Sequence, residues 1–284
     1  MADHADPLVS VDWLAERLSA PDIRVLDATV YLPGDPRDAR AIYAEKRIPG
    51  AIFFDIDDIA DTSSPLPHML PSPEKFSSRV RRLGLGDGNK IVVYDTTPML
   101  GATRVWWMFR VMGHKDVAVL DGGLPKWLAE GHPVTDDPTP PRERHFTARI
   151  DNTLVRSLDD VRGLIDSKRE QIVDARAANR FRGEVPEPRA GLRAGHMPGA
   201  LNLPYNELID PKTGTILPAK ALAERLAAAG IDPARKVTAS CGSGVSACVV
   251  ALALYLTGAP EAAVYDGSWT EWGGRADTPI VSGP

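Results

Sequence analysis

Cysteine is scarce in this chain, and the features that would place it on a membrane are missing. The 284 residues include 2 cysteines, Cys241 and Cys248. Their spacing matches neither a zinc site nor a disulfide framework. No apolar run approaches the roughly 20 residues of a membrane span, and the N-terminal stretch lacks the basic and apolar regions of a signal peptide. We therefore expect reduced thiols, a cytoplasmic location and no association with a membrane.

The chain also lacks an excess of basic residues and any low-complexity tract. The formal net charge is −5, and charges of both signs are interspersed. No basic stripe is available for nucleic acid, so we expect no nucleic-acid partner. The 25 prolines and 24 glycines are spread along the chain, and 43% of the residues are hydrophobic. This composition predicts a globular fold over nearly the whole length, as one large domain or two of ordinary size.

The two halves of the chain repeat each other in order. The segments VLDAT, IPGAIFFD and VAVLDGGLPKW of the first half correspond to IVDAR, MPGALNLP and AAVYDGSWTEW of the second. Corresponding segments lie roughly 145 to 149 residues apart. A drift this small is explained by short loop insertions, so the sequence predicts a duplicated domain.

Each half alternates short apolar strands with amphipathic stretches. This alternation predicts an α/β fold in which each domain is a parallel sheet flanked by helices. The stretch PVTDDPTPPRERHF is rich in proline and charge and has no periodicity. We interpret its residues 138–147 as an interdomain linker. The predicted domains are then residues 1–137 and 148–284.

One strand-to-helix junction carries a cysteine in the second half only. The predicted strand KVTAS ends at Cys241, and a helix resumes at about Val245. Asp95 stands at the matching position of the first half, so that copy keeps the geometry without a nucleophile. We therefore expect the second domain to carry the chemistry.

The loop after Cys241 favours a negatively charged sulfur. Gly242 and Gly244 flank Ser243 and allow a tight turn with inward-facing N–H groups, and the following helix adds its positive N-terminal end. Both effects favour the thiolate, which is a nucleophile. The alternative is that Cys241 is a small buried residue at a strand end, which is common for free cysteine. For Cys248, on an apolar helix face, core packing is the better interpretation.

A cysteine-headed loop is also found in phosphatases that use a Cys-x5-Arg motif. In those enzymes the arginine clamps the phosphoryl group. Here the position six residues after Cys241 is Ala247. The missing guanidinium argues against phosphoryl transfer.

The tandem organisation and the loop CGSGVS together resemble the two-domain rhodanese-like sulfurtransferases. The resemblance extends from about Pro7 to Thr278 and includes the segments FFDID, TSSPLPHMLP, RVWWMFRVMGH, RFRGEVPEPR, AGHMPGALN and YDGSWTEW. It implies an inactive first domain, and a persulfide formed on Cys241.

Two loop types within that family imply different sulfur donors. Thiosulfate-specific members resemble Cys-Arg-Lys-Gly-Val-Thr, a cationic loop suited to a compact dianion, whereas the Gly-Ser-Gly-Val pattern is typical of the 3-mercaptopyruvate branch. The loop of this chain carries no positive charge, so the resemblance implies 3-mercaptopyruvate as donor. Thiosulfate:cyanide sulfurtransferase is the alternative within the class. A non-enzymatic rhodanese-fold sulfur carrier is the alternative from another class.

The positive charge for a carboxylate donor must then come from elsewhere. The segment RFRGEVPEPRAGLR holds four arginines, and a guanidinium fork suits a carboxylate and its neighbouring ketone. The resemblance assigns substrate binding to Arg180 and Arg189. Arg182 and Arg193 are then surface or salt-bridge residues. The alternative is that all four pair with the glutamates of the same segment, Glu184 and Glu187.

The resemblance also implies a proton relay. Ser243, His68 and Asp57 fall where this branch has a serine–histidine–aspartate arrangement. His68 would pass a proton through Ser243 to or from the reacting thiol and the enolate, and Asp57 would fix the tautomer of His68. A lone loop histidine is otherwise an ordinary surface residue.

The expected reaction is ping-pong. Cys241 takes sulfur from 3-mercaptopyruvate and passes it to a thiol such as thioredoxin or to cyanide. The backbone N–H groups of Gly242, Ser243, Gly244, Val245 and Ser246 would stabilise the persulfide anion. No metal and no organic cofactor is expected.

Overall fold

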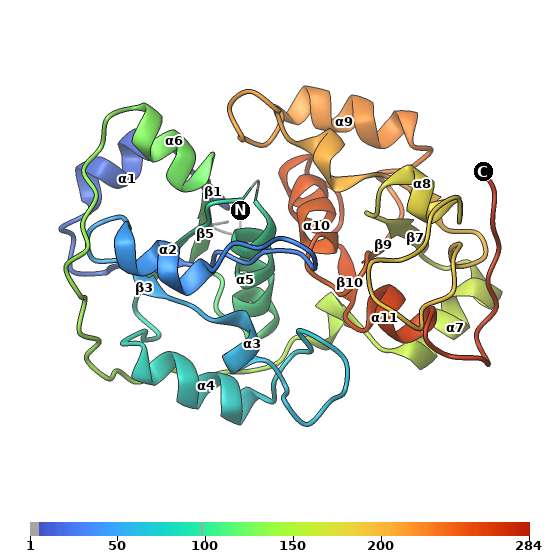
Figure 1. Ribbon diagram of the computed structural model, residues 1–284, viewed down its shortest axis with the longest axis horizontal. Coiled ribbons are helices and arrows are strands. Elements are labelled where there is room, and N and C mark those ends of the chain that lie inside the picture. The colour runs from blue at the N-terminus through green and yellow to red at the C-terminus, as the bar shows by residue number, and fades with distance from the viewer. Residues whose placement is uncertain (1–5, 98) are drawn as a thin grey trace. The chain divides into compact units, whose positions relative to one another are not determined.

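The computed structural model describes residues 6–97 and 99–284, which form two compact units (Figure 1). Of these described residues, the first unit contains those up to Thr62, those within Leu70–Asp151 and Pro211–Ile216, and the second contains Ser63–Met69, Asn152–Asp210 and Leu217–Pro284. Residues 1–5, where the predicted first domain begins, lie outside the described residues. Each unit is built around its own sheet.

The first unit has a five-stranded parallel sheet in the order β1-β5-β4-β2-β3. Its strands are β1 (Leu8–Val9), β2 (Ile23–Asp27), β3 (Ile52–Phe53), β4 (Lys90–Tyr94) and β5 (Val117–Leu120). Its helices are α1 (Val11–Arg17), α2 (Ala39–Glu45), α3 (Ile56–Ile59), α4 (Pro73–Arg82), α5 (Leu100–Val111) and α6 (Gly123–Ala129).

The second unit repeats this topology in the order β6-β10-β9-β7-β8, again with every pair parallel. Its strands are β6 (Val155–Arg156), β7 (Gln171–Asp174), β8 (Leu201–Asn202), β9 (Val237–Ser240) and β10 (Ala263–Tyr265). Its α-helices are α7 (Leu158–Ser167), α8 (Ala178–Phe181), α9 (Ala219–Ala228), α10 (Ala247–Leu256) and α11 (Ser268–Trp272). Two short 3-10 helices are η1 (Asn152–Leu154) and η2 (Tyr205–Leu208). The predicted fold class, two duplicated α/β domains with parallel sheets, is confirmed.

The central strands and the helices that follow them are the most deeply buried elements. Strands β4 and β9 have every residue buried apart from Lys90, and α5 is buried along its whole length. Helix α10 is buried over residues 247–254. A helix that is apolar on all sides must lie inside a core, which explains why ACVVALAL shows no polar face. The junctions that hold Asp95 and Cys241 are therefore attached to the most deeply buried elements of the two units.

The predicted linker has no helix or strand and packs against the first unit. The Ser77 hydroxyl donates to the Phe146 carbonyl at 2.6 Å, and the Asp87 N–H donates to the His145 carbonyl at 3.1 Å. Phe146 is buried against Phe76 and Phe109. The predicted domain bounds, 1–137 and 148–284, stay a prediction; the first compact unit extends through residues 138–147 to Asp151.

Within the part of the chain that the structure describes, no helix combines the length and the apolar character needed to cross a membrane.

Candidate active site

Cys241 lies at the carboxyl end of β9, in the loop that leads to α10. Cys241 is buried, with 1% of its surface exposed. The strand ends at Ser240 and the helix begins at Ala247, two residues later than the sequence predicts. Gly244 has a φ of +76°, a left-handed conformation that glycine adopts without strain. The predicted strand–loop–helix junction around the cysteine is therefore present.

The backbone of this loop is held by α11. The Trp269 N–H donates to the Cys241 carbonyl at 3.0 Å, and the Thr270 N–H donates to the Gly242 carbonyl at 2.8 Å. The Cys241 N–H itself donates to the Ser268 hydroxyl at 3.2 Å. These bonds fix the loop carbonyls away from the turn, toward the adjacent helix.

Four backbone N–H groups of the turn differ from these carbonyls, because they have no hydrogen-bond partner among the described residues. Among residues 6–97 and 99–284, no acceptor takes the backbone N–H of Gly242, Ser243, Val245 or Ser246. Several N–H groups in succession in such a turn are a binding site for negative charge. The loop thus has the donors that a sulfur anion on Cys241 requires.

Arg180 is brought to the cysteine loop by a buried ion network. A side-chain carbon placed on Gly242 would lie 3.4 Å from Arg180 Nη2, so the guanidinium lies beside the residue that follows Cys241. Arg180 Nη2 and Nε donate to Glu187 at 2.5 and 3.2 Å. The Glu187 side chain is 1% exposed and also accepts from Arg176 at 2.8 Å.

Arg176 anchors this network to the sheet. It donates to Asp174, the last residue of β7, and to the Gly195 carbonyl, and it lies 4.1 Å from the ring centroid of Trp269. Burial by itself would lower the pKa of Arg176, but the carboxylates of Asp174 and Glu187 outweigh that effect and raise it. Arg176 is therefore a permanently charged buried residue.

Arg189 and His68 lie together in the second unit. The distance from Arg189 Nη2 to His68 Nε2 is 3.5 Å. The segment Ser63–Met69 belongs to this unit although it comes from the first half of the sequence. His68 has a φ of +62°, and it is half-buried.

The other two members of the predicted relay lie in different units. Ser243 is buried in the cysteine loop, whereas Asp57 is an exposed residue of α3 in the first unit. The relay of Ser243, His68 and Asp57 stays a prediction.

The two arginines that we placed outside the site make structural contacts. Arg182 forms a bidentate pair with Glu184, at 2.6 and 2.9 Å, and both side chains are exposed. Arg193 donates to the carbonyls of Gly273, Trp272 and Thr278. The alternative of pairing within the segment holds for Arg182 and also for Arg180, whose partner is Glu187.

Sequence reasoning missed two residues near the cysteine. Ser268 accepts the Cys241 N–H, as described above. Burial and then the negative charge of Cys241 raise the pKa of Tyr205, which places this tyrosine within electrostatic reach of the sulfur. Tyr205 follows β8 at the carboxyl edge of the sheet, the edge where ligands of open α/β sheets bind. This position after a strand is the sequence feature that could have identified Tyr205 as a site residue.

In the first unit the matching loop holds a buried carboxyl. Asp95 is 1% exposed, and its Oδ2 accepts from the Ala102 N–H at 2.9 Å. Burial, as the main cause, and the charge of the nearby Asp27 together raise the pKa of Asp95 to about 7. The first copy thus keeps an acidic side chain at the head of its loop, without a nucleophilic sulfur.

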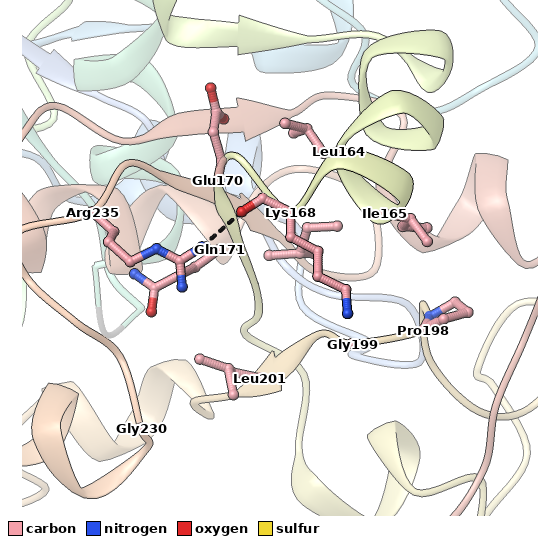
Figure 2. Close-up of a pocket in the computed structure, with 11 residues that line it drawn as sticks. Leu164, Ile165, Lys168, Glu170, Gln171, Pro198, Gly199, Leu201, Gly230 and Arg235 are labelled. Atoms are coloured by element: carbon pink, nitrogen blue, oxygen red, sulfur yellow. Dashed lines mark hydrogen bonds between the residues drawn. The ribbon is translucent and has the colours of Figure 1, made fainter.

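A hollow of about 490 Å³ in the second unit does not belong to this site (Figure 2). It is lined by Lys168, Gln171 and Arg235, among other residues, and the Arg235 guanidinium donates to the Lys168 carbonyl at 2.8 Å. Gln171 begins β7, whereas Cys241 follows the end of the parallel strand β9. The hollow and the cysteine are therefore at opposite edges of the sheet.

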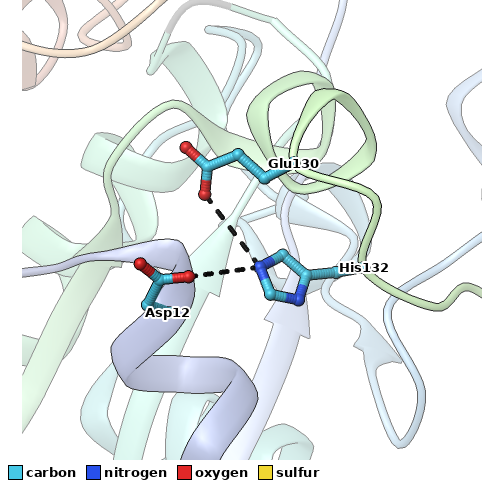
Figure 3. A group of neighbouring side chains, drawn as sticks. All are labelled: Asp12, Glu130 and His132. Atoms are coloured by element: carbon cyan, nitrogen blue, oxygen red, sulfur yellow. Dashed lines mark ion pairs between the residues drawn. The ribbon is translucent and has the colours of Figure 1, made fainter.

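One group of side chains in the described part of the chain has the composition of a metal site (Figure 3). It consists of Asp12, Glu130 and His132 in the first unit. His132 Nε2 lies 3.5 Å from Asp12 and 4.0 Å from Glu130. Both carboxylates are exposed, and these contacts describe a surface ion pair as well as they describe a ligand set.

Taken together, fold and site define a class: a tandem α/β protein whose second copy has a cysteine at the head of a glycine-containing turn and whose first copy has an aspartate there. A model of the rhodanese-like domain matches residues 10–130 and 157–275. The chain belongs to the rhodanese-like family and, with its two domains, to the sulfurtransferases of that family, which are enzymes.

Relatives with either donor in their names are similarly close. The human 3-mercaptopyruvate sulfurtransferase is 42% identical over 275 residues, which cover 95% of this chain and 92% of that protein. The mouse thiosulfate sulfurtransferase is 45% identical over 276 residues, with the same coverage of 95% and 92%. The crystal structure of SseA from Escherichia coli, described as a 3-mercaptopyruvate sulfotransferase, is 38% identical with a TM-score of 0.85 and covers 93% of this chain and 99% of that one.

Proposed function

We propose that the protein is a 3-mercaptopyruvate sulfurtransferase with Cys241 as its nucleophile. The observation that carries this proposal is the uncharged loop Cys241–Ser246 with the Arg180 guanidinium beside Gly242. Sequence identity to relatives does not choose the donor, because proteins named for 3-mercaptopyruvate and for thiosulfate match at similar levels, 42% and 45%.

The charge distribution favours the carboxylate donor over thiosulfate. Thiosulfate is a compact dianion, and a cationic loop around the sulfur would suit it. In 3-mercaptopyruvate the single charge lies on a carboxylate away from the sulfur. Arg180 and Arg189 lie outside the loop, so they can hold that carboxylate and the neighbouring ketone while the donor sulfur faces Cys241.

In the donor half-reaction the Cys241 thiolate attacks the sulfur of 3-mercaptopyruvate. A sulfur–sulfur bond forms and the carbon–sulfur bond of the donor breaks. The bonding electrons go to the carbon, which leaves the enolate of pyruvate. A proton then converts the enolate into pyruvate, and the enzyme is left as a Cys241 persulfide.

The turn supplies the stabilisation of that persulfide. The N–H groups of Gly242, Ser243, Gly244, Val245 and Ser246 would donate to the terminal sulfur anion. In the acceptor half-reaction a thiol such as that of thioredoxin, or cyanide, attacks this terminal sulfur. With cyanide the product is thiocyanate. With thioredoxin the attacking thiol first takes the sulfur as a persulfide, and a second thiol of thioredoxin then displaces it as hydrogen sulfide and leaves a thioredoxin disulfide. In both cases the Cys241 thiolate is regenerated.

The proton movements are assigned to the relay. His68 exchanges a proton with the reacting groups through Ser243, and Asp57 fixes its tautomer. The chemistry requires no metal and no organic cofactor. Two free thiols suit a reducing compartment, so the cytoplasm remains the proposed location.

A direct comparison of donors tests the proposal. We expect kcat/KM for 3-mercaptopyruvate to exceed that for thiosulfate by at least about tenfold with cyanide as the common acceptor. A preference for thiosulfate would support the thiosulfate:cyanide alternative. Inactivity with both donors would support the carrier alternative.

A further inference from the structure

The buried carboxylate of Glu187 joins the two arginines nearest to the cysteine loop. It accepts from Arg176 on one side and, through both oxygens, from Arg180 on the other. Glu187 is thus the only carboxylate, among the described residues, that the structure pairs with Arg180. This ion pair is therefore a contact that can set the orientation of the Arg180 guanidinium.

The network that holds Glu187 is itself tied to the nucleophile. The Arg176 guanidinium lies over the Trp269 ring, and the backbone N–H of Trp269 donates to the Cys241 carbonyl. The chain of contacts runs from the cysteine loop through Trp269 and Arg176 to Glu187, and returns through Arg180 to Gly242. A change at Glu187 would therefore alter the position of Arg180 beside Gly242 in the cysteine loop.

The network also balances its charge. Asp174 and Glu187 carry two negative charges, and Arg176 and Arg180 carry two positive ones. The Asp174, Arg176 and Glu187 side chains are at most 1% exposed, so their charges are weakly screened by solvent. Arg180 can offer oriented N–H groups to a donor, but the net charge of the cluster is zero.

We propose that Glu187 is a positioning residue that also sets donor specificity: it fixes the Arg180 guanidinium beside Gly242 and cancels its charge, so that the site favours a donor with one negative charge over a donor with two. This inference rests on the proposed sulfur transfer at Cys241. A dianion gains about twice as much as a monoanion from each uncompensated positive charge. Removing the Glu187 charge should therefore help thiosulfate, while the loss of orientation should harm 3-mercaptopyruvate.

The same segment offers a matched control. Glu184 holds Arg182 in the same bidentate geometry, but that pair is exposed. Glu184→Gln makes the same chemical change at a site with high dielectric screening, where an ion pair contributes little.

The experiment uses the ping-pong kinetics of the full chain. In such a scheme kcat/KM for each substrate reports its own half-reaction. For Glu187→Gln we expect kcat/KM for 3-mercaptopyruvate to fall about tenfold, the thiosulfate to 3-mercaptopyruvate ratio to rise at least about tenfold, and kcat/KM for cyanide to stay within about twofold. Glu184→Gln should leave all three within about twofold.

Two results would overturn the inference. One is an equal loss with both donors and with cyanide, since that pattern describes general damage to the fold. The other is an unchanged donor ratio in Glu187→Gln. If the wild type used neither donor, or preferred thiosulfate, the proposed function would fail first and this inference with it.

A second variant carries the test if Glu187→Gln does not fold. Glu187→Asp keeps the charge but withdraws the carboxylate from Arg180 by about one methylene. We expect KM for 3-mercaptopyruvate to rise about fivefold with kcat within about twofold. The thiosulfate to 3-mercaptopyruvate ratio then rises only through this KM, while kcat/KM for thiosulfate itself stays within about twofold because the charge is kept. Unchanged KM in Glu187→Asp would show that Glu187 does not position Arg180.

Discussion

Asp95, which stands where the second unit has its cysteine, should make the first unit less stable as the pH rises. The carboxyl group is buried, and burial raises its pKa to about 7 from the ordinary value of 3.8. Below about pH 4 the group is protonated in the folded and in the unfolded chain. Between about pH 4 and 7 the unfolded chain loses this proton and the folded chain keeps it, so stability falls.

The size of this effect follows from the difference between the two pKa values. Each pKa unit corresponds to about 1.4 kcal/mol, so a shift of about three units corresponds to about 4 kcal/mol in total. This contribution of the protonated Asp95 to the free energy of unfolding is fully present below about pH 4 and is lost once the pH has passed about 7. Between pH 5 and pH 8 alone, the loss is about 3 kcal/mol.

The variant Asp95→Asn isolates the pH-dependent contribution of the Asp95 carboxyl group to stability. The asparagine keeps the shape and an oxygen that can accept the Ala102 N–H, but it cannot lose a proton. We expect the free energy of unfolding of Asp95→Asn, relative to the wild type, to rise by about 3 kcal/mol between pH 5 and pH 8.

Urea unfolding followed by tryptophan fluorescence measures this difference. Four of the six tryptophans, Trp13, Trp106, Trp107 and Trp127, lie in the first unit. Asp137→Asn, at an exposed position, is the control and should follow the wild type at every pH. A stability difference between Asp95→Asn and the wild type that is the same at pH 5 and pH 8 would refute the reasoning.

Three further tests of the site use single substitutions. Cys241→Ser should abolish sulfur transfer, and retained turnover would show the nucleophile assignment to be wrong. Its control, Cys248→Ala, should keep at least about half of the activity and lose about 1 kcal/mol of stability, because Cys248 is a core residue. Gly244→Ala should cost about 1 to 2 kcal/mol in urea unfolding and lower kcat, since its φ of +76° strains any other residue; a neutral result would mean that the turn tolerates a side chain. Arg189→Lys should raise KM for 3-mercaptopyruvate about tenfold with little change in kcat/KM for cyanide, because the charge remains and the fork is lost; equal KM values in a steady-state assay would remove Arg189 from the donor site.

Local sequence determined the elements and the position of the cysteine. The alternation of apolar and amphipathic segments predicted two parallel α/β units, and the duplicated segments placed Asp95 and Cys241 at equivalent junctions. These features depend on residues close in sequence and on the restricted geometry of a strand followed by a glycine turn and a helix. The helix start was displaced by two residues, because the ends of helices depend on backbone bonds that propensity does not specify.

Tertiary structure alone decided which charges meet. The sequence offered four arginines and two glutamates in one segment, with substrate binding and internal pairing both open. The fold buries Glu187 against Arg176 and Arg180, and leaves Glu184 with Arg182 at the surface. Likewise, His68 lies beside Arg189, which is more than a hundred residues away in sequence. Long-range contacts of this kind arise from how sheets and loops pack, and no local pattern encodes them.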